Sequence, residues 1–96
     1  MDVDTVLKEK RDEILRIAAD HGVRDIRVFG SAARGEADEN SDVDFLVEME
    51  PGRSLLDLSG LLVDLRELLG RKVDVVTKNG LYRLLRRRII KEARPL

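Results

Sequence analysis

Residues 28–35 read Val-Phe-Gly-Ser-Ala-Ala-Arg-Gly and residues 41–47 read Ser-Asp-Val-Asp-Phe-Leu-Val, and these two segments decide the fold. Polar and apolar residues alternate over 24–29, which predicts a half-buried strand that ends at Gly30. A second strand is expected over 42–48, where Asp42 and Asp44 share one face because strand side chains alternate in direction. The sequence therefore predicts two strands joined by a small-residue turn and an acidic loop, with two carboxylates at the start of the second strand.

At Gly30 and Ser31 the first predicted strand gives way to a short helical turn over 32–34. Backbone N–H groups at the start of such a turn, together with a serine hydroxyl, suit a phosphate group. Glycine also lets a ligand approach the backbone closely. A Gly-Ser pair taken alone is more often an ordinary turn, so its meaning depends on what lies nearby.

A third strand is predicted over 72–76, where Asp74 stands alone among valines. If this strand neighbours the second, three carboxylates converge, and like charges brought so close are unfavourable unless a cation lies between them. Three acids, no histidine and a nearby phosphate-binding turn describe a two-metal phosphoryl or nucleotidyl transfer site. The alternative is a sheet with an ordinary acidic solvent face. That alternative explains Asp42 or Asp44 alone better than it explains Asp74, since aspartate is disfavoured in strands.

The composition limits both the chemistry and the compartment. The 96 residues predict a single domain over 1–96, with no cysteine and one histidine. We expect that histidine, His21, to interact with the dipole of a helix end rather than to act in catalysis. Oxygen ligands therefore remain for any metal, which favours magnesium, manganese or calcium. A net charge of −1 gives no general attraction to nucleic acid or membranes. With no signal peptide or membrane-length apolar run, we expect a cytoplasmic protein.

Helical patterns flank the three predicted strands. The first helix starts at Asp4 or Thr5 and stops at Gly22. A second helix is expected over 54–69, capped by its first residue, and a third over about 81–93. The order αβαβαβα predicts an α+β fold, with a small mixed sheet and helices packed largely on one face.

The predicted helix over 55–69 has more apolar surface than one core-facing stripe needs, since its leucines cover about two-thirds of its circumference. We expect three leucines to face the sheet: Leu55, Leu62 and Leu69. Three others either pack on a neighbouring helix or form a protein interface, including one between copies of the chain in a homo-oligomer: Leu61, Leu65 and Leu68.

The last predicted helix has a basic face that is either solvated or used to bind an acidic protein or RNA: Arg83, Arg86, Arg87 and Lys91. Tyr82, the only tyrosine, is expected to be a half-buried core residue.

Gly30-Ser31, Asp42-Val43-Asp44 and a lone Asp74 on a later strand resemble the signature of the polymerase-beta-type nucleotidyltransferase superfamily. More narrowly, the two quoted segments resemble the minimal nucleotidyltransferases, which are stand-alone domains of about this size, and the resemblance covers nearly the whole chain. It implies a palm-like nucleotidyltransferase fold. It also implies that Asp42 and Asp44 hold divalent metals and that Asp74 activates the attacking hydroxyl while touching one metal.

The same resemblance implies that Gly30 and Ser31 contact a nucleoside triphosphate. Arg34 matches no family position closely; it either reaches a phosphate or is a solvated loop arginine.

The implied activity is transfer of AMP or another nucleoside monophosphate, with ATP as donor and two Mg²⁺ ions, or Mn²⁺, as cofactors. The family resemblance points to a tyrosine of a small all-helical HEPN toxin as the acceptor, with this chain as the antitoxin. The alternative is a non-catalytic module of the same fold that binds a partner. A third interpretation, nucleic-acid binding through the last helix, predicts a steep salt dependence. The nucleobase and the acceptor stay open at this point.

Overall fold

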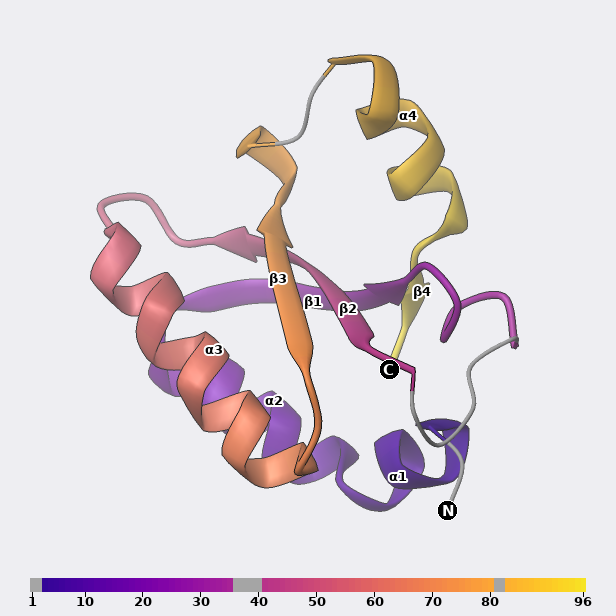
Figure 1. The fold of residues 1–96 in the computed structure, drawn as a ribbon. Helices are drawn as coiled ribbons and strands as arrows, with labels where there is room; N and C mark the ends of the chain where they lie inside the picture. The colour runs from indigo at the N-terminus through magenta and orange to yellow at the C-terminus, as the bar shows by residue number, and fades with distance from the viewer. Residues whose placement is uncertain (1–2, 36–40, 81–82) are drawn as a thin grey trace.

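A four-stranded sheet organises the computed structural model, which describes residues 3–35, 41–80 and 83–96 (Figure 1). In chain order the elements are α1 (Val3–Glu9), α2 (Arg11–Asp20), β1 (Val23–Phe29), β2 (Val43–Met49), α3 (Leu55–Leu69), β3 (Val73–Thr77), the 3₁₀ turn η1 (Lys78–Gly80), α4 (Arg83–Glu92) and β4 (Arg94–Pro95). The strand order is β3-β2-β1-β4, with β2 parallel to β3 and β1 antiparallel to both β2 and β4. The predicted α+β fold with a small mixed sheet is confirmed.

One face of this sheet carries the core. Figure 1 shows α1, α2 and α3 together on one side of the strands and α4 apart from them. Side chains from these three helices pack with alternate residues of the strands, and the most deeply buried of them are Val3, Ile14, Phe45, Val47, Leu61, Leu65 and Val73. Helices are thus packed largely on one face, as predicted.

The parallel pairing of β2 with β3 depends on α3, because parallel strands need a long crossover between them. Ser54 caps α3 by accepting a hydrogen bond from the Leu56 N–H at 3.2 Å, while the Asp57 carboxylate accepts one from the Ser54 N–H at 3.0 Å. Gly70 ends the helix in the left-handed conformation at φ 63°. Both ends of α3 therefore lie where the sequence predicts them.

The predicted facing of α3 is confirmed for Leu69, which is buried in the core, and is wrong for Leu55 and Leu62. Leu61 and Leu65 are completely buried, whereas Leu55 is 80% exposed and Leu62 is only partly buried. Leucines occupy most of the circumference of this helix, so their spacing alone does not indicate which side meets the sheet. The first turn, with Leu55 and Leu56, points into solvent.

The first helix is also not one element. It divides at Lys10 into α1 and α2, although hydrogen bonds from Lys10 N–H to Val6 O and from Ile14 N–H to Lys10 O continue across the division. The two helices are therefore successive segments of one helical stretch, whose backbone hydrogen bonds continue through Lys10. Leu81 and Tyr82, and the side chains at 83–86, lie outside the described residues, so the expectations for them stay predictions. Across the described ranges, no helix is long and apolar enough to cross a membrane.

Candidate active site

The parallel ladder between β2 and β3 places two of the three predicted aspartates side by side. Asp44 is the direct partner of Asp74, and on its other side Asp44 is the partner of Phe29 in β1. Partners in adjacent strands share one face of a sheet and lie about 5 Å apart. Phe29, Asp44 and Asp74 therefore form a row across three strands, on the face opposite the core.

Gly30 continues this row directly against the Asp44 carboxylate. Its φ is +69°, and a Cβ added there would lie 2.6 Å from Asp44 Oδ2. Any other residue here would strain the backbone, and its Cβ would displace the Asp44 carboxylate. The turn that sequence analysis assigned to a phosphate therefore begins next to the aspartate assigned to a metal.

The turn after Gly30 is a single helical turn and not the start of a longer helix. The Arg34 N–H donates to Gly30 O at 3.1 Å, and Gly35, at φ +71°, ends the turn. Ala32 and Ala33 are buried and anchor it to the core. The first N–H groups of such a turn have no partner within it. Phosphate binding here would therefore rest on these N–H groups and the Ser31 hydroxyl, with little help from a helix dipole.

The row is not an ordinary solvent face. Leu46 lies two residues beyond Asp44 on the same face and is only 1% exposed. Burial is the main cause that raises the pKa of Asp44, and the negative charges of Asp74 and Asp42 raise it further. Lys72 and Arg34 act in the opposite direction. The site thus holds more negative charge than its own cations balance.

That excess charge fits a divalent metal, which carboxylate oxygens bind well and which would relieve the repulsion. The ligand set is not assembled in this structure, however. Among the described residues, no three acidic or histidine side chains lie close enough together to hold an ion. Asp42 precedes β2, and its Oδ2 lies 3.7 Å from Lys72 Nζ. Asp44 and Asp74 are therefore the pair around which an ion could bind, and Asp42 could join them only by releasing Lys72.

Two cations at the site were missed or left open by sequence analysis. Lys72 precedes Asp74 by two residues, so the strand periodicity that placed the aspartates could also have placed this lysine beside them. Arg34 pairs with Glu92 of α4, its Nη1 lying 3.3 Å from Glu92 Oε2. No local signal in the sequence joins residues so far apart. The interaction ties the turn after Gly30 to the last helix.

His21 is separate from the site, as expected, but its partner is a side chain. Its Nε2 lies 2.7 Å from Asp64 Oδ2, which links the end of α2 to α3. Gly60 of α3 makes room for the imidazole, since a Cβ added there would lie 2.8 Å from His21 Cε1. His21 therefore has a structural role at the contact between these helices.

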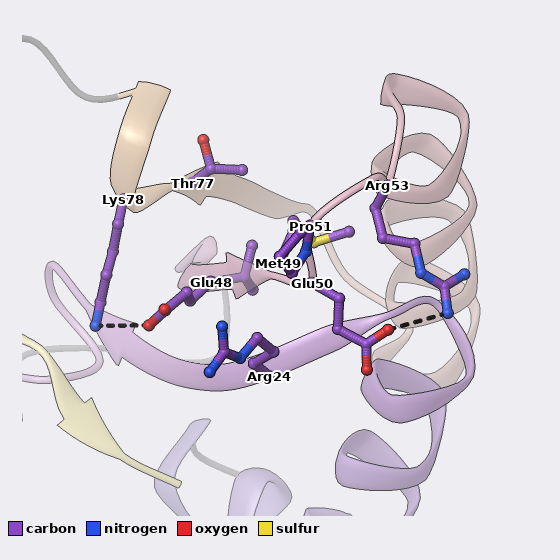
Figure 2. A pocket seen from close by; sticks show the side chains of 9 residues that line it. Arg24, Glu48, Met49, Glu50, Pro51, Arg53, Thr77 and Lys78 are labelled. Atoms are coloured by element: carbon purple, nitrogen blue, oxygen red, sulfur yellow. Dashed lines mark hydrogen bonds and ion pairs between the residues drawn. The ribbon is translucent and has the colours of Figure 1, made fainter.

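A hollow of about 570 Å³ opens at the other ends of β2 and β3 (Figure 2). Figure 2 shows Lys78 paired with Glu48 and Arg53 paired with Glu50 along its wall. These pairs balance most of the charge in the hollow. The hollow is distinct from the row of aspartates, because Asp44 and Asp74 begin the strands whose last residues line it.

Comparison with known proteins adds the family context. The model of the nucleotidyltransferase domain family matches residues 7–96 of the chain. MJ0435 of Methanocaldococcus jannaschii, named as a candidate protein adenylyltransferase, is 47% identical over 87 residues, which cover 91% of this chain and 94% of that protein. MntA of Thermococcus cleftensis, named a protein adenylyltransferase, is 48% identical over 71 residues, which cover 74% of this chain and 72% of MntA.

Solved structures agree with the sequence comparisons. One described as a candidate minimal nucleotidyltransferase matches with a TM-score of 0.88 and 49% identity, covering 100% of this chain and 97% of the other. The crystal structure of a toxin–antitoxin with AMP-PNP matches with a TM-score of 0.75 and 22% identity, covering 88% of this chain and 69% of the other. At that lower identity the likeness is one of fold.

Proposed function

The chain belongs to the nucleotidyltransferase domain family, and we propose that it is a protein adenylyltransferase that moves AMP from ATP to a tyrosine hydroxyl of a partner protein. Its fold and its family were both predicted from the sequence and are confirmed. One observation carries the proposal beyond the family: Asp44 lies between the Gly30 turn and Asp74. In the proposed reaction the Gly30 turn would bind the phosphates on one side of Asp44, and Asp74 would act as the general base on the other side.

Each residue has a role in the proposed reaction. Gly30 and Ser31 hold the phosphates through N–H groups and a hydroxyl. Asp74 accepts the proton of the acceptor hydroxyl, whose oxygen forms a bond to the α-phosphorus of ATP. The bond from that phosphorus to the bridging oxygen breaks, and pyrophosphate leaves with its electrons. Asp42, Asp44 and Asp74 are the residues that would hold Mg²⁺, which when bound neutralises charge that develops on the phosphates.

The choice of AMP and of a protein acceptor draws on the relatives. MntA carries the name protein adenylyltransferase, and MJ0435 is named as a candidate for the same activity. A structural neighbour of the same fold is a toxin–antitoxin complex with AMP-PNP, an ATP analogue. These names support an antitoxin that modifies its toxin, and the family resemblance in the sequence supports a small helical HEPN protein as that toxin.

Labelled ATP tests the proposal. The wild type, given Mg²⁺, ATP labelled in its α-phosphate and the HEPN-type protein, is expected to label a tyrosine of that protein. The double variant Asp42→Asn/Asp44→Asn is expected to transfer no label. Asp12→Asn is the matched control, because the Asp12 side chain is 93% exposed and lies on α2. Equal labelling by the double variant would refute the site.

Calorimetry separates the proposal from the non-catalytic alternative. A nucleotidyltransferase is expected to bind Mg-ATP both in the presence and in the absence of its acceptor protein. A wild type that binds the helical partner but shows no heat of Mg-ATP binding in either state would be a binding module only.

A further inference from the structure

β3 is an edge strand that runs past the candidate active site. The sheet order is β3-β2-β1-β4, so in the part of the chain that the structure describes β3 has a strand on only one side. Figure 1 shows β3, in orange, crossing in front of β1 and β2. An edge of this kind presents backbone N–H and C=O groups that another chain can pair with, and proteins usually block such edges.

The hydrogen bonds tell which groups face outward. The Val43 N–H donates to Lys72 O at 3.1 Å, so in the parallel ladder Asp74 and Val76 direct their backbone groups toward β2. Val73, Val75 and Thr77 must then direct theirs away from the sheet. Arg66 confirms this direction, because its guanidinium donates to Val73 O from outside at 3.2 and 3.3 Å.

Arg66 therefore caps the start of the edge and leaves its middle open. Within the described residues, no hydrogen bond reaches the outward N–H or C=O of Val75. The side chain of Val75 packs against the core on the opposite face, so the residue is firmly placed while its backbone groups remain available. The open part of the edge lies directly beside Asp74.

We propose that the edge of β3 binds an extended segment of the acceptor protein as an added strand, which places the acceptor hydroxyl beside Asp74. The inference rests on the proposed function. It adds the conformation of the acceptor and the surface that holds it. Main-chain hydrogen bonds to Val75 supply the affinity, as in other cases where a peptide adds a strand to a sheet.

The row across the sheet is the reason for choosing an acceptor segment. Asp44 and Asp74 are partners on neighbouring strands, and Gly30, which directly follows β1, lies against the Asp44 carboxylate. The next position in that row belongs to a residue of the added strand, about 5 Å from Asp74 and on the same face. The nucleotide phosphates would lie at one end of the row and the acceptor hydroxyl at the other, with the carboxylates between. In an in-line reaction the attacking hydroxyl and the leaving pyrophosphate lie on opposite sides of the α-phosphorus, and this arrangement along the row would allow that.

A second copy of this chain fits the edge less well. A symmetric antiparallel pairing of β3 centred on Val75 would bring Lys72 of one copy opposite Lys78 of the other, and like charges directly opposite are destabilising. Such a pairing would also cover the position beside Asp74 that the acceptor needs.

The test uses a defined probe, the capped peptide acetyl-Thr-Val-Tyr-Val-Thr-amide at millimolar concentration with Mg-ATP. Mass spectrometry measures the AMP-modified peptide. The comparison peptide has N-methyl groups on its three central residues, which removes the donors for strand pairing whichever way the peptide runs. Transfer to the methylated peptide is expected to be lower by roughly tenfold, as the loss of one or two strand hydrogen bonds implies.

Protein variants test the same edge from the other side. Val75→Pro removes an outward N–H without removing a bond to β2, and proline is tolerated at such edge positions. Val75→Ala keeps that N–H and is the matched control for the lost side chain. We expect Val75→Pro to lose transfer to the peptide while its calorimetric affinity for Mg-ATP stays unchanged. Thr77→Pro, which removes the next outward N–H, replaces Val75→Pro if the latter does not fold.

Amide hydrogen exchange then measures the protection of the backbone N–H groups along the β3 edge directly. In the free protein the Val75 N–H is expected to exchange fast and those of Asp74 and Val76 slowly, and the peptide is expected to protect Val75. The inference is overturned if Val75→Pro transfers AMP to the peptide as fast as Val75→Ala does, or if the methylated peptide is modified as fast as the unmethylated one. It is also overturned by a wild type that binds Mg-ATP but modifies neither peptide. Protection of Val75 that depends on protein concentration also overturns it, because a second copy then occupies the edge. A wild type that does not bind Mg-ATP refutes the proposed function instead.

Discussion

At the scale of single residues, Asp44 carries the largest electrostatic cost in the candidate site. It is partly buried, it faces Asp74 across the ladder, and Asp42 lies two residues away. Lys72 and Arg34 offset only part of this charge. Carboxylates with a perturbed pKa cluster at active sites, which is what makes Asp44 a candidate functional residue.

The raised pKa of Asp44 predicts how stability depends on pH. The folded protein holds this proton to a higher pH than the unfolded chain, whose ordinary value is 3.8. The stability that protonated Asp44 contributes is therefore present at low pH and is lost as the pH rises through the folded pKa. At neutral pH, with metal ions removed by EDTA, Asp44→Asn is expected to have a higher midpoint of thermal unfolding than the wild type.

Calorimetric melts across the pH range check this sign. The advantage of Asp44→Asn is expected to shrink as the pH falls below the folded pKa, and to shrink at neutral pH when Mg²⁺ stabilises the wild type. A variant that is less stable than the wild type at neutral pH without metal would contradict the account of the site.

Gly30 offers a second prediction at this scale, with Gly35 as its control. Both have positive φ, at +69° and +71°, so alanine costs each about 1–2 kcal/mol of backbone strain. Only at Gly30 does the new Cβ meet a neighbour, the Asp44 carboxylate. Denaturant melts are expected to show a loss for both variants, and AMP transfer is expected to fall much further for Gly30→Ala. Equal activity in the two variants would mean that the contact with Asp44 has no part in the reaction.

At the scale of elements, the contact between α2 and α3 depends on the His21 imidazole, which packs against Gly60. Alanine for glycine in a helix normally stabilises by about 0.5–1 kcal/mol. At Gly60 the added Cβ would meet the His21 ring, which Asp64 holds in place. We therefore expect Gly60→Ala to destabilise the protein.

A double-mutant cycle measures this contact. In a His21→Ala background the same Gly60→Ala change is expected to stabilise, which gives a coupling energy on the order of 1 kcal/mol. If Gly60→Ala stabilises both backgrounds equally, the imidazole does not fill this space in solution.

The sequence predicted the elements whose pattern is local. The three longer strands begin and end within one residue of their predicted bounds, and the Ser54 and Gly70 ends of α3 are confirmed. The facing of α3 could not be predicted, because leucines surround that helix. β4 could not be predicted either. It has two residues and exists through its pairing with Arg27 and Val28 of β1.

At the scale of the whole molecule, the candidate site depends on one topological fact that the sequence left conditional. Asp44 and Asp74 meet only because β3 is the parallel neighbour of β2, in a register that makes them partners. The aspartates themselves were predicted from their spacing. The ion pair of Lys72 with Asp42 follows from that same register, whereas the ion pair of Arg34 with Glu92 depends on a tertiary contact with no local signal.

The same topology leaves the molecule open beside Asp74. α3 and Arg66 cover one end of the β3 edge, and the described residues place no element along its middle. Under the proposed function, the chain would bind its nucleotide alone, and another chain would complete the acceptor side. Partner recognition and catalysis would then share one strand.

The most direct test of the central claim is the rate of AMP transfer by Asp74→Asn, measured with α-labelled ATP, Mg²⁺ and the helical partner. Asp25→Asn is the control, because Asp25 lies on β1 and bonds Arg27 away from the row. If Asp74 takes the proton of the attacking hydroxyl, the rate is expected to fall by about 10²–10⁴-fold, while Asp25→Asn transfers at the wild-type rate. Transfer by Asp74→Asn at the wild-type rate would contradict the account.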